Sequence, residues 1–174
     1  MRAFGLAGWS GSGKTTLLTR LLPELIGRGV SVSTVKHAHH DFDVDQPGKD
    51  SWQHRQAGAT EVMVASGRRW ALMHELRDAP EPGLLELVRH MSPVDLLLVE
   101  GFKRHPLPKL EVWRPSVGKP PLWPDDPLVR AIATDESVPA DWHGRLTLPV
   151  LELDAIAPIA DFILDHAASL EASS

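Results

Sequence analysis

The chain has 174 residues, no cysteine and a formal net charge of −5, a size that suits one well-cored domain spanning residues 1–174. The negative charge and the lack of a basic stripe argue against nucleic-acid binding, and no apolar run is long enough to cross a membrane. Without cysteine there are no disulfides or thiolate metal sites, and we expect a soluble, unprocessed, cytoplasmic protein.

The first element is a strand-like stretch at residues 3–7, and a helical pattern follows in which Leu17, Leu21 and Leu25 recur until Gly27. Between them lies a segment that fills every fixed position of the pattern G-x-x-x-x-G-K-[ST]. Together with the threonine that follows, it consists of Gly8, Trp9, Ser10, Gly11, Ser12, Gly13, Lys14, Thr15 and Thr16. The order strand, loop, helix favours a phosphate-binding loop over a glycine-rich turn without a ligand.

Each position of this loop has an expected role in binding a nucleotide. The glycines let backbone N–H groups line an anion-sized nest, and the helix start adds its positive end. We expect Lys14 to reach the β and γ phosphates, Thr15 to ligate Mg²⁺ and Thr16 to touch the α phosphate. Trp9 is the one tryptophan whose position indicates direct contact with the ligand.

A second strand at residues 30–35 leads into a loop at 37–49 that is rich in imidazole and carboxylate groups. One interpretation is a zinc site built from His37, His39, His40 or the aspartates, although the spacing matches no closed zinc pattern. Another is a switch-like loop in which Asp43 or Asp45 joins Mg²⁺ while His37 contacts phosphate or substrate. The third is a polar surface loop.

A short helix at residues 50–57 carries Arg55, which either stabilises phosphate charge or lies on the surface. Strand signals at 61–65 and 70–76 then predict an antiparallel hairpin, followed by a helix at 83–91. The apolar run at 94–100 marks a central strand that ends in Glu100. Glu100 is expected to hold Mg²⁺, directly or through water, and the alternative is a solvated acid beside a turn. The following Lys103 approaches phosphate or a second substrate, unless it belongs to a solvated loop.

Further strands are expected at residues 109–113, 128–133 and 150–153, with a closing helix at 156–170 and a surface excursion at 114–127. Strands alternating with helices predict a three-layer α/β P-loop NTPase fold with a mostly parallel sheet and an extra β-hairpin. Asp135 follows one of these strands and pairs with guanine N1 and N2, or serves as a cap or turn acid. The Asn-Lys-x-Asp signature is absent.

Three segments together resemble the molybdopterin-guanine dinucleotide biosynthesis protein B (MobB) family. They are the glycine-rich segment, the run Lys36-His37-Ala38-His39-His40 with Asp43 to Asp50, and Leu98-Val99-Glu100-Gly101-Phe102-Lys103. The resemblance implies a homodimeric protein that binds GTP with Mg²⁺ and hydrolyses it slowly. It also implies an accessory role in attaching GMP to the molybdenum cofactor, with molybdopterin and the guanylyltransferase MobA as partners.

Three functions fit these residues. The first is a weak GTPase adaptor in which Lys14, Glu100 and Asp45 support slow attack by water. The second is a small-molecule kinase using ATP or GTP, with Asp43 or Asp45 orienting an acceptor hydroxyl and Arg55 stabilising the transferred group. The third is a metal-delivery module in which nucleotide controls release of a transition metal from the His-Asp loop.

Overall fold

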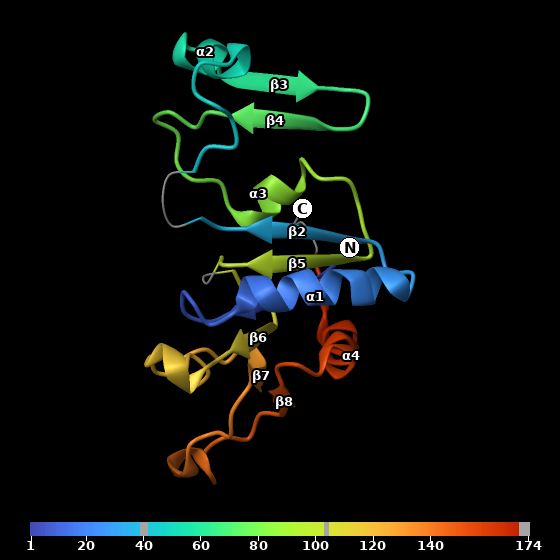
Figure 1. Ribbon diagram of the computed structural model, residues 1–174, viewed down its shortest axis with the longest axis vertical. Coiled ribbons are helices and arrows are strands. Elements are labelled where there is room, and N and C mark those ends of the chain that lie inside the picture. The colour runs from blue at the N-terminus through green and yellow to red at the C-terminus, as the bar shows by residue number, and fades with distance from the viewer. Residues whose placement is uncertain (39–41, 103–104, 171–174) are drawn as a thin grey trace. The chain divides into compact units, whose positions relative to one another are not determined.

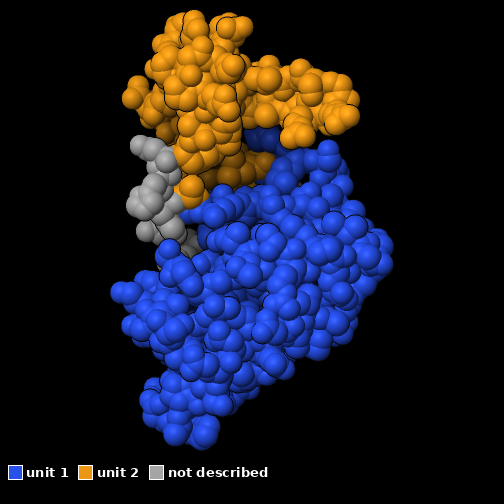
Figure 2. All heavy atoms as spheres, viewed as in Figure 1, with its two compact units in different colours: residues 1–37, 88–174 blue, residues 38–87 orange. Residues whose placement is uncertain are grey.

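A computed structural model describes residues 1–38, 42–102 and 105–170 of the chain. The chain divides into two compact units, which Figure 2 shows in blue and orange. Unit 1 consists of residues 1–37 and 88–174, and unit 2 consists of residues 38–87. The single domain expected from the chain length stays a prediction.

Unit 1 is built on a seven-stranded sheet in which all strands of the main path are parallel. The strands of this path are β1 (Arg2–Ala7), β2 (Val32–Lys36), β5 (Leu96–Glu100), β6 (Lys109–Val112), β7 (Val129–Thr134) and β8 (Val150–Glu152). Their spatial order is β2-β5-β1-β6-β7-β8, so β1 lies at the centre between β5 and β6. This confirms the mostly parallel sheet, and Leu96 to Val99 of β5 are fully buried as its continuous apolar run predicts.

Two helices, α1 (Lys14–Gly27) and α4 (Ile156–His166), lie side by side against one face of this sheet (Figure 1). Because apolar residues recur at helical spacing on both, each presents a stripe to the sheet. The buried core between them includes Leu17, Leu21 and Leu25 of α1, Ile159 and Ile163 of α4, and Phe4, Leu98 and Leu110 of the strands. Burial of these side chains provides the main stabilisation of unit 1.

The closing helix ends earlier than the sequence pattern predicts. It stops at His166, and Ala168–Ser169 form a short strand, β9, that pairs antiparallel with Arg2 and Ala3 of β1. The parallel neighbour β6 pairs with β1 only from Gly5 to Ala7. Strand β9 therefore supplies the hydrogen bonds that the start of β1 would otherwise lack on that side.

Strand β6 carries two buried charged side chains, and both hold the segment that follows this strand in the chain. Lys109 forms an ion pair of 2.8 Å with Asp126. The carboxylate of Glu111, which is fully buried, accepts hydrogen bonds from the backbone N–H groups of Leu122 and Trp123. Burial raises the pKa of Glu111, opposed by these two hydrogen bonds. The expected surface excursion is thus held to the sheet by contacts within the chain.

Unit 2 contains helix α2 (Asp50–Gln56) and the strands β3 (Glu61–Ala65) and β4 (Trp70–His74). The two strands pair antiparallel, with Met63 opposite Leu72, which confirms the predicted hairpin. Helix α3 (Leu84–Val88) follows and is shorter than expected, because a turn closes from Met91 N–H to the Val88 carbonyl just before Pro93. No helix in the described part of the chain is long and apolar enough to span a membrane.

Candidate functional site

The glycine-rich segment at residues 8–15, here called the phosphate loop, joins the carboxyl end of β1 to helix α1. Gly8, Gly11 and Gly13 have φ angles of 138°, 82° and 97°, which side-chain-bearing residues rarely adopt. At Gly8 a Cβ atom would also lie 2.4 Å from the carbonyl oxygen of Val112 in the neighbouring β6. The glycines are therefore required both by the backbone turn and by close packing against the sheet.

Lys14 occupies the first turn of α1 and folds back over the phosphate loop. Its Nζ atom donates to the carbonyl oxygens of Gly8 and Trp9, each at 3.0 Å. Thr15, Thr16 and Ser10 are exposed, whereas the buried hydroxyl of Ser12 has no hydrogen-bond partner among the described residues. A cation above the loop and exposed hydroxyls at the start of the helix suit a phosphate ester with its counter-ion.

Trp9 has a second contact that the sequence did not indicate. Its indole Nε1–H donates to the carbonyl oxygen of Pro120 at 2.7 Å, and Lys119 Nζ lies 5.8 Å from the centre of the ring. The phosphate loop is thereby tied to the segment after β6. The expected contact between Trp9 and a ligand stays a prediction.

Glu100 ends strand β5 directly beside the strand that precedes the phosphate loop. It is paired in register with Leu6 of β1 and with Lys36 of β2. Its carboxylate is about one tenth exposed, and Oε2 lies 4.0 Å from Lys36 Nζ. The backbone N–H of His37 donates to the Glu100 carbonyl at 2.8 Å. The carboxyl ends of β1, β2 and β5 thus bring together the phosphate loop, Glu100 and His37, as expected for adjacent parallel strands.

The turn after Glu100 is strained. Gly101 has φ of 90°, and a Cβ atom on it would lie 2.6 Å from the Cβ of His37. Phe102 follows with φ of 47°, and its ring centre lies 5.0 Å from that of His37. Strain at such a point persists only where the surroundings enforce it, and it occurs most often at ligand sites.

Arg114 and Asp135 complete this edge of the sheet in unit 1. Arg114 Nε lies 3.2 Å from Asp135 Oδ2, and the guanidinium Cζ lies 3.3 Å from the position a Cβ would take on Gly13. Sequence analysis named Asp135 but not Arg114. Arg114 could have been found from its position in the sequence, because it lies two residues beyond β6, a strand that neighbours β1.

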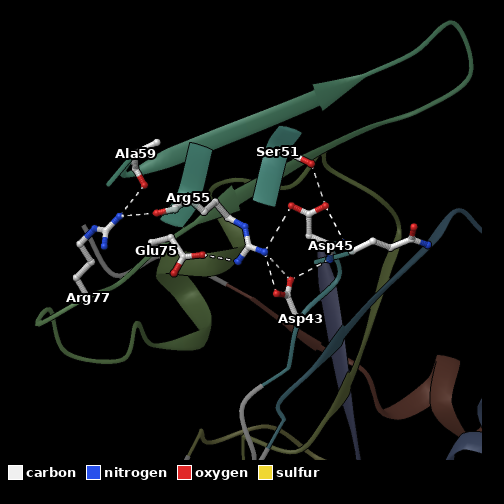
Figure 3. A network of polar contacts seen from close by, with 8 residues as sticks. Asp43, Asp45, Ser51, Arg55, Ala59, Glu75 and Arg77 are labelled. Carbon is white, nitrogen blue, oxygen red and sulfur yellow. Dashed lines mark hydrogen bonds and ion pairs between the residues drawn. The ribbon is translucent and has the colours of Figure 1, made fainter. Parts of the chain in front are cut away.

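Unit 2 contains a separate network of charges around Arg55 (Figure 3). The guanidinium donates to both oxygens of Asp43 and to Glu75, each at 2.8 Å, and lies 3.5 Å from Asp45. The hydrogen bonds that Arg55 donates to Asp43 and Glu75 raise the pKa of Arg55, and the one to Asp43 lowers the pKa of Asp43. The kinase interpretation depends on Asp43, Asp45 and Arg55, and all three take part in this network.

Asp45 is part of the same network in unit 2. Its Oδ1 accepts hydrogen bonds from the Ser51 hydroxyl and from the Gln46 N–H, each at 2.9 Å. The proposed roles of Asp45 in catalysis and in Mg²⁺ binding stay predictions. Among the described residues, no group of three His, Asp or Glu side chains is arranged around a metal ion. His39, His40 and Lys103, which are candidate site residues from the sequence, lie outside the described residues.

A central parallel strand that runs through a glycine-rich loop into a helix, beside a strand ending in a carboxylate, defines a P-loop protein of the α/β class. The family model of molybdopterin guanine dinucleotide synthesis protein B, MobB, matches residues 3–135. The chain therefore belongs to the MobB family.

Two curated relatives carry the name molybdopterin-guanine dinucleotide biosynthesis adapter protein. That of Haemophilus influenzae is 43% identical over 162 residues, covering 91% of this chain and 85% of the relative. That of Escherichia coli K12 is 44% identical over 162 residues, covering 91% and 89%. Both comparisons extend over nearly the whole chain, so the similarity is not confined to the phosphate loop.

Solved structures of MobB proteins are similar to this chain in fold. A crystal structure of molybdopterin-guanine biosynthesis protein B superimposes with a TM-score of 0.70 at 28% identity, covering 94% of this chain and 98% of the other. Bacillus subtilis MobB superimposes with a TM-score of 0.70 at 23% identity, covering 98% and 100%, which supports the fold alone. The α/β fold with its extra hairpin is thereby confirmed.

Proposed function

We propose that the protein is a GTP-binding, weakly hydrolysing adapter in the synthesis of molybdopterin guanine dinucleotide. It acts with the guanylyltransferase MobA and presents nucleotide or the molybdenum cofactor to that enzyme. The observation that carries this proposal is the phosphate loop of a MobB-family chain, with Lys14 above it and Glu100 on the adjacent strand. The names of the relatives supply the pathway.

The proposed residue roles follow the positions of the side chains. Lys14 binds phosphate, while the hydroxyl of Thr15 and the carboxylate of Glu100 supply the hard oxygen ligands that Mg²⁺ prefers. Asp45 stays a candidate Mg²⁺ ligand and catalytic residue on the grounds of the sequence. His37 lies at the same strand edge as Glu100 and contacts phosphate or substrate. Asp135 accepts hydrogen bonds from the guanine N1 and N2 donors.

Slow hydrolysis follows from what these residues supply. Lys14 and Glu100 position the nucleotide and neutralise charge, but the proposed site assigns no dedicated arginine or glutamine to stabilise the transition state. Such a missing donor costs about 10³ to 10⁵ in rate. The adapter role needs no fast turnover.

The hairpin of unit 2 supports a homodimer. One of its faces presents Met63 and Trp70, about three fifths exposed, next to the partly exposed Leu72. Large apolar side chains gathered on a two-stranded sheet favour a protein interface over contact with water. We propose that a second copy of this chain covers that face.

Competition binding tests the proposal. A fluorescent GTP analogue is displaced from the full-length protein by GTP or ATP, with Mg²⁺ or with EDTA present. We expect GTP to displace at a lower concentration than ATP and EDTA to weaken both. Preference for ATP, together with a phosphorylated product in a metabolite screen, would indicate the kinase instead, and no binding of either nucleotide would refute the proposal.

A further inference from the structure

Arg114 lies between two parts of the nucleotide site that are far apart in the sequence. Strand β6, which precedes it, has β1 on one side and β7 on the other. The phosphate loop follows β1, and Asp135 follows β7. The side chain of Arg114 lies near both: its Nε is 3.2 Å from the Asp135 carboxylate, and its Cζ is 3.3 Å from the position that a Cβ on Gly13 would take.

The contact with Asp135 restricts a carboxylate that is otherwise poorly held. Asp135 is about one third exposed, and no hydrogen bond from another side chain to its carboxylate is found among the described residues. The contact is an ion pair without hydrogen-bond geometry, because the buried Arg114 Nε has no hydrogen-bond partner among the described residues, so the charge of the guanidinium is what holds the carboxylate nearby. The ion pair runs through Oδ2, and a carboxylate has about four lone-pair sites, so one partner does not use up its capacity to accept from a ligand.

The contact with Gly13 fixes the other end of this arrangement. Gly13 precedes Lys14 and is the N-terminal cap of α1, so its position relative to the nucleotide phosphates is set by the phosphate loop itself. A Cβ on Gly13 would be in tight contact with the Arg114 guanidinium, whose Cζ lies 3.3 Å from that position. The guanidinium therefore lies close to both the phosphate loop and the Asp135 carboxylate.

We propose that Arg114 is a positioning residue that determines base specificity, because it holds the Asp135 carboxylate at a set place relative to the phosphate loop. The ligand read in this way is a purine nucleotide with two adjacent N–H donors, as in guanine. This inference rests on the proposed function. It assigns no step of hydrolysis to Arg114.

Affinities for GTP and ATP, measured on the full-length protein with Mg²⁺, test the proposal. Arg114→Ala is expected to lower GTP affinity about tenfold, the size of one charge-assisted hydrogen bond, and to change ATP affinity by less than about twofold. Asp135→Asn is expected to have the same effect. The double variant is expected to bind GTP no more weakly than either single variant, because both substitutions remove the same interaction. Arg114→Lys is expected to recover part of the selectivity.

Two other results would overturn the inference. An equal loss for GTP and ATP would mean that the charge of Arg114 acts on the phosphates, and additive losses would mean that the two residues act independently. Arg28→Ala is the matched control, because Arg28 also pairs with carboxylates of unit 1 but lies at the opposite end of α1. The ratio of its affinities for GTP and ATP is expected to equal that of the wild type.

Two further measurements separate this test from folding and from the proposed function. Thermal unfolding of each variant shows whether it is folded, and Arg114→Gln replaces the alanine variant if that one is not. A wild-type protein that binds no nucleotide would refute the proposed function. A wild-type protein that prefers GTP, with Arg114 variants of the same preference, would refute only the role of Arg114.

Discussion

The Nζ atom of Lys14 lies 3.0 Å from the carbonyl oxygen of Gly8, six residues earlier in the chain. The same atom donates to the Trp9 carbonyl. The cation is thus held above the phosphate loop by neutral acceptors of the loop itself. Anionic phosphate oxygens are stronger acceptors for an ammonium than these two carbonyls, so phosphate of a bound nucleotide would compete with them for this donor.

Replacement of Lys14 by alanine removes this cation. We expect Lys14→Ala to weaken GTP binding about a hundredfold, because several charge-assisted hydrogen bonds to phosphate are lost. Isothermal titration calorimetry with Mg²⁺ measures the change. Lys49→Ala, an exposed lysine at the start of α2, is the control and is expected to bind as the wild type does. Unaltered binding by Lys14→Ala would contradict the role of the phosphate loop.

Gly101→Ala is expected to destabilise the protein by about 3 kcal/mol. The cost combines a φ of 90° with the clash between the added Cβ and His37. Gly118→Ala is the matched control, because Gly118 has φ of 65° with open space around it and is expected to cost only about 1 kcal/mol. Urea unfolding measures both, and equal losses would show that the contact with His37 is unimportant.

A charge on the exposed hairpin face is expected to separate the proposed dimer. Trp70→Glu places a carboxylate where the partner copy would pack, so light scattering is expected to give a mass about half that of the wild type. Gln56→Glu adds the same charge at the end of α2 and is expected to leave the mass unchanged. A wild-type protein that is monomeric at every concentration would disprove the dimer.

Stability is expected to fall in acid, partly because of Asp95. The Ser31 hydroxyl and backbone N–H both donate to the Asp95 carboxylate, and these hydrogen bonds lower its pKa below the usual range of an aspartate. They also join the starts of β2 and β5. A pKa lowered in the folded state gives stability that is present above the unfolded pKa and is lost as pH falls through the folded one.

Asp95→Asn removes this dependence. Between about pH 7 and pH 3, chemical unfolding is expected to show a smaller loss of stability for Asp95→Asn than for the wild type. Asp125→Asn, at an exposed position of unit 1, is the comparison. The same acid loss in wild type and Asp95→Asn would rule out the contribution of the bond to Ser31.

Local patterns in the sequence were sufficient for the phosphate loop, the hairpin and the central strand ending in Glu100. The pattern G-x-x-x-x-G-K-[ST] and the alternation of apolar residues depend on neighbours a few positions apart, and the structure has these elements within one or two residues of the expected bounds. The predicted end of α4 was wrong, because the residues after it form β9 by pairing with a strand more than 160 residues earlier in the chain.

The identity of the chain as a P-loop protein with a parallel sheet was determined by the sequence alone, because glycine torsions and hydrophobic periods are local properties. Only the tertiary structure revealed that Arg114 joins Asp135 to the phosphate loop and that Arg55 gathers the carboxylates of unit 2. Such contacts depend on the order of strands and on side-chain directions, and these are decided by packing across the whole sheet and hairpin rather than by any short run of residues.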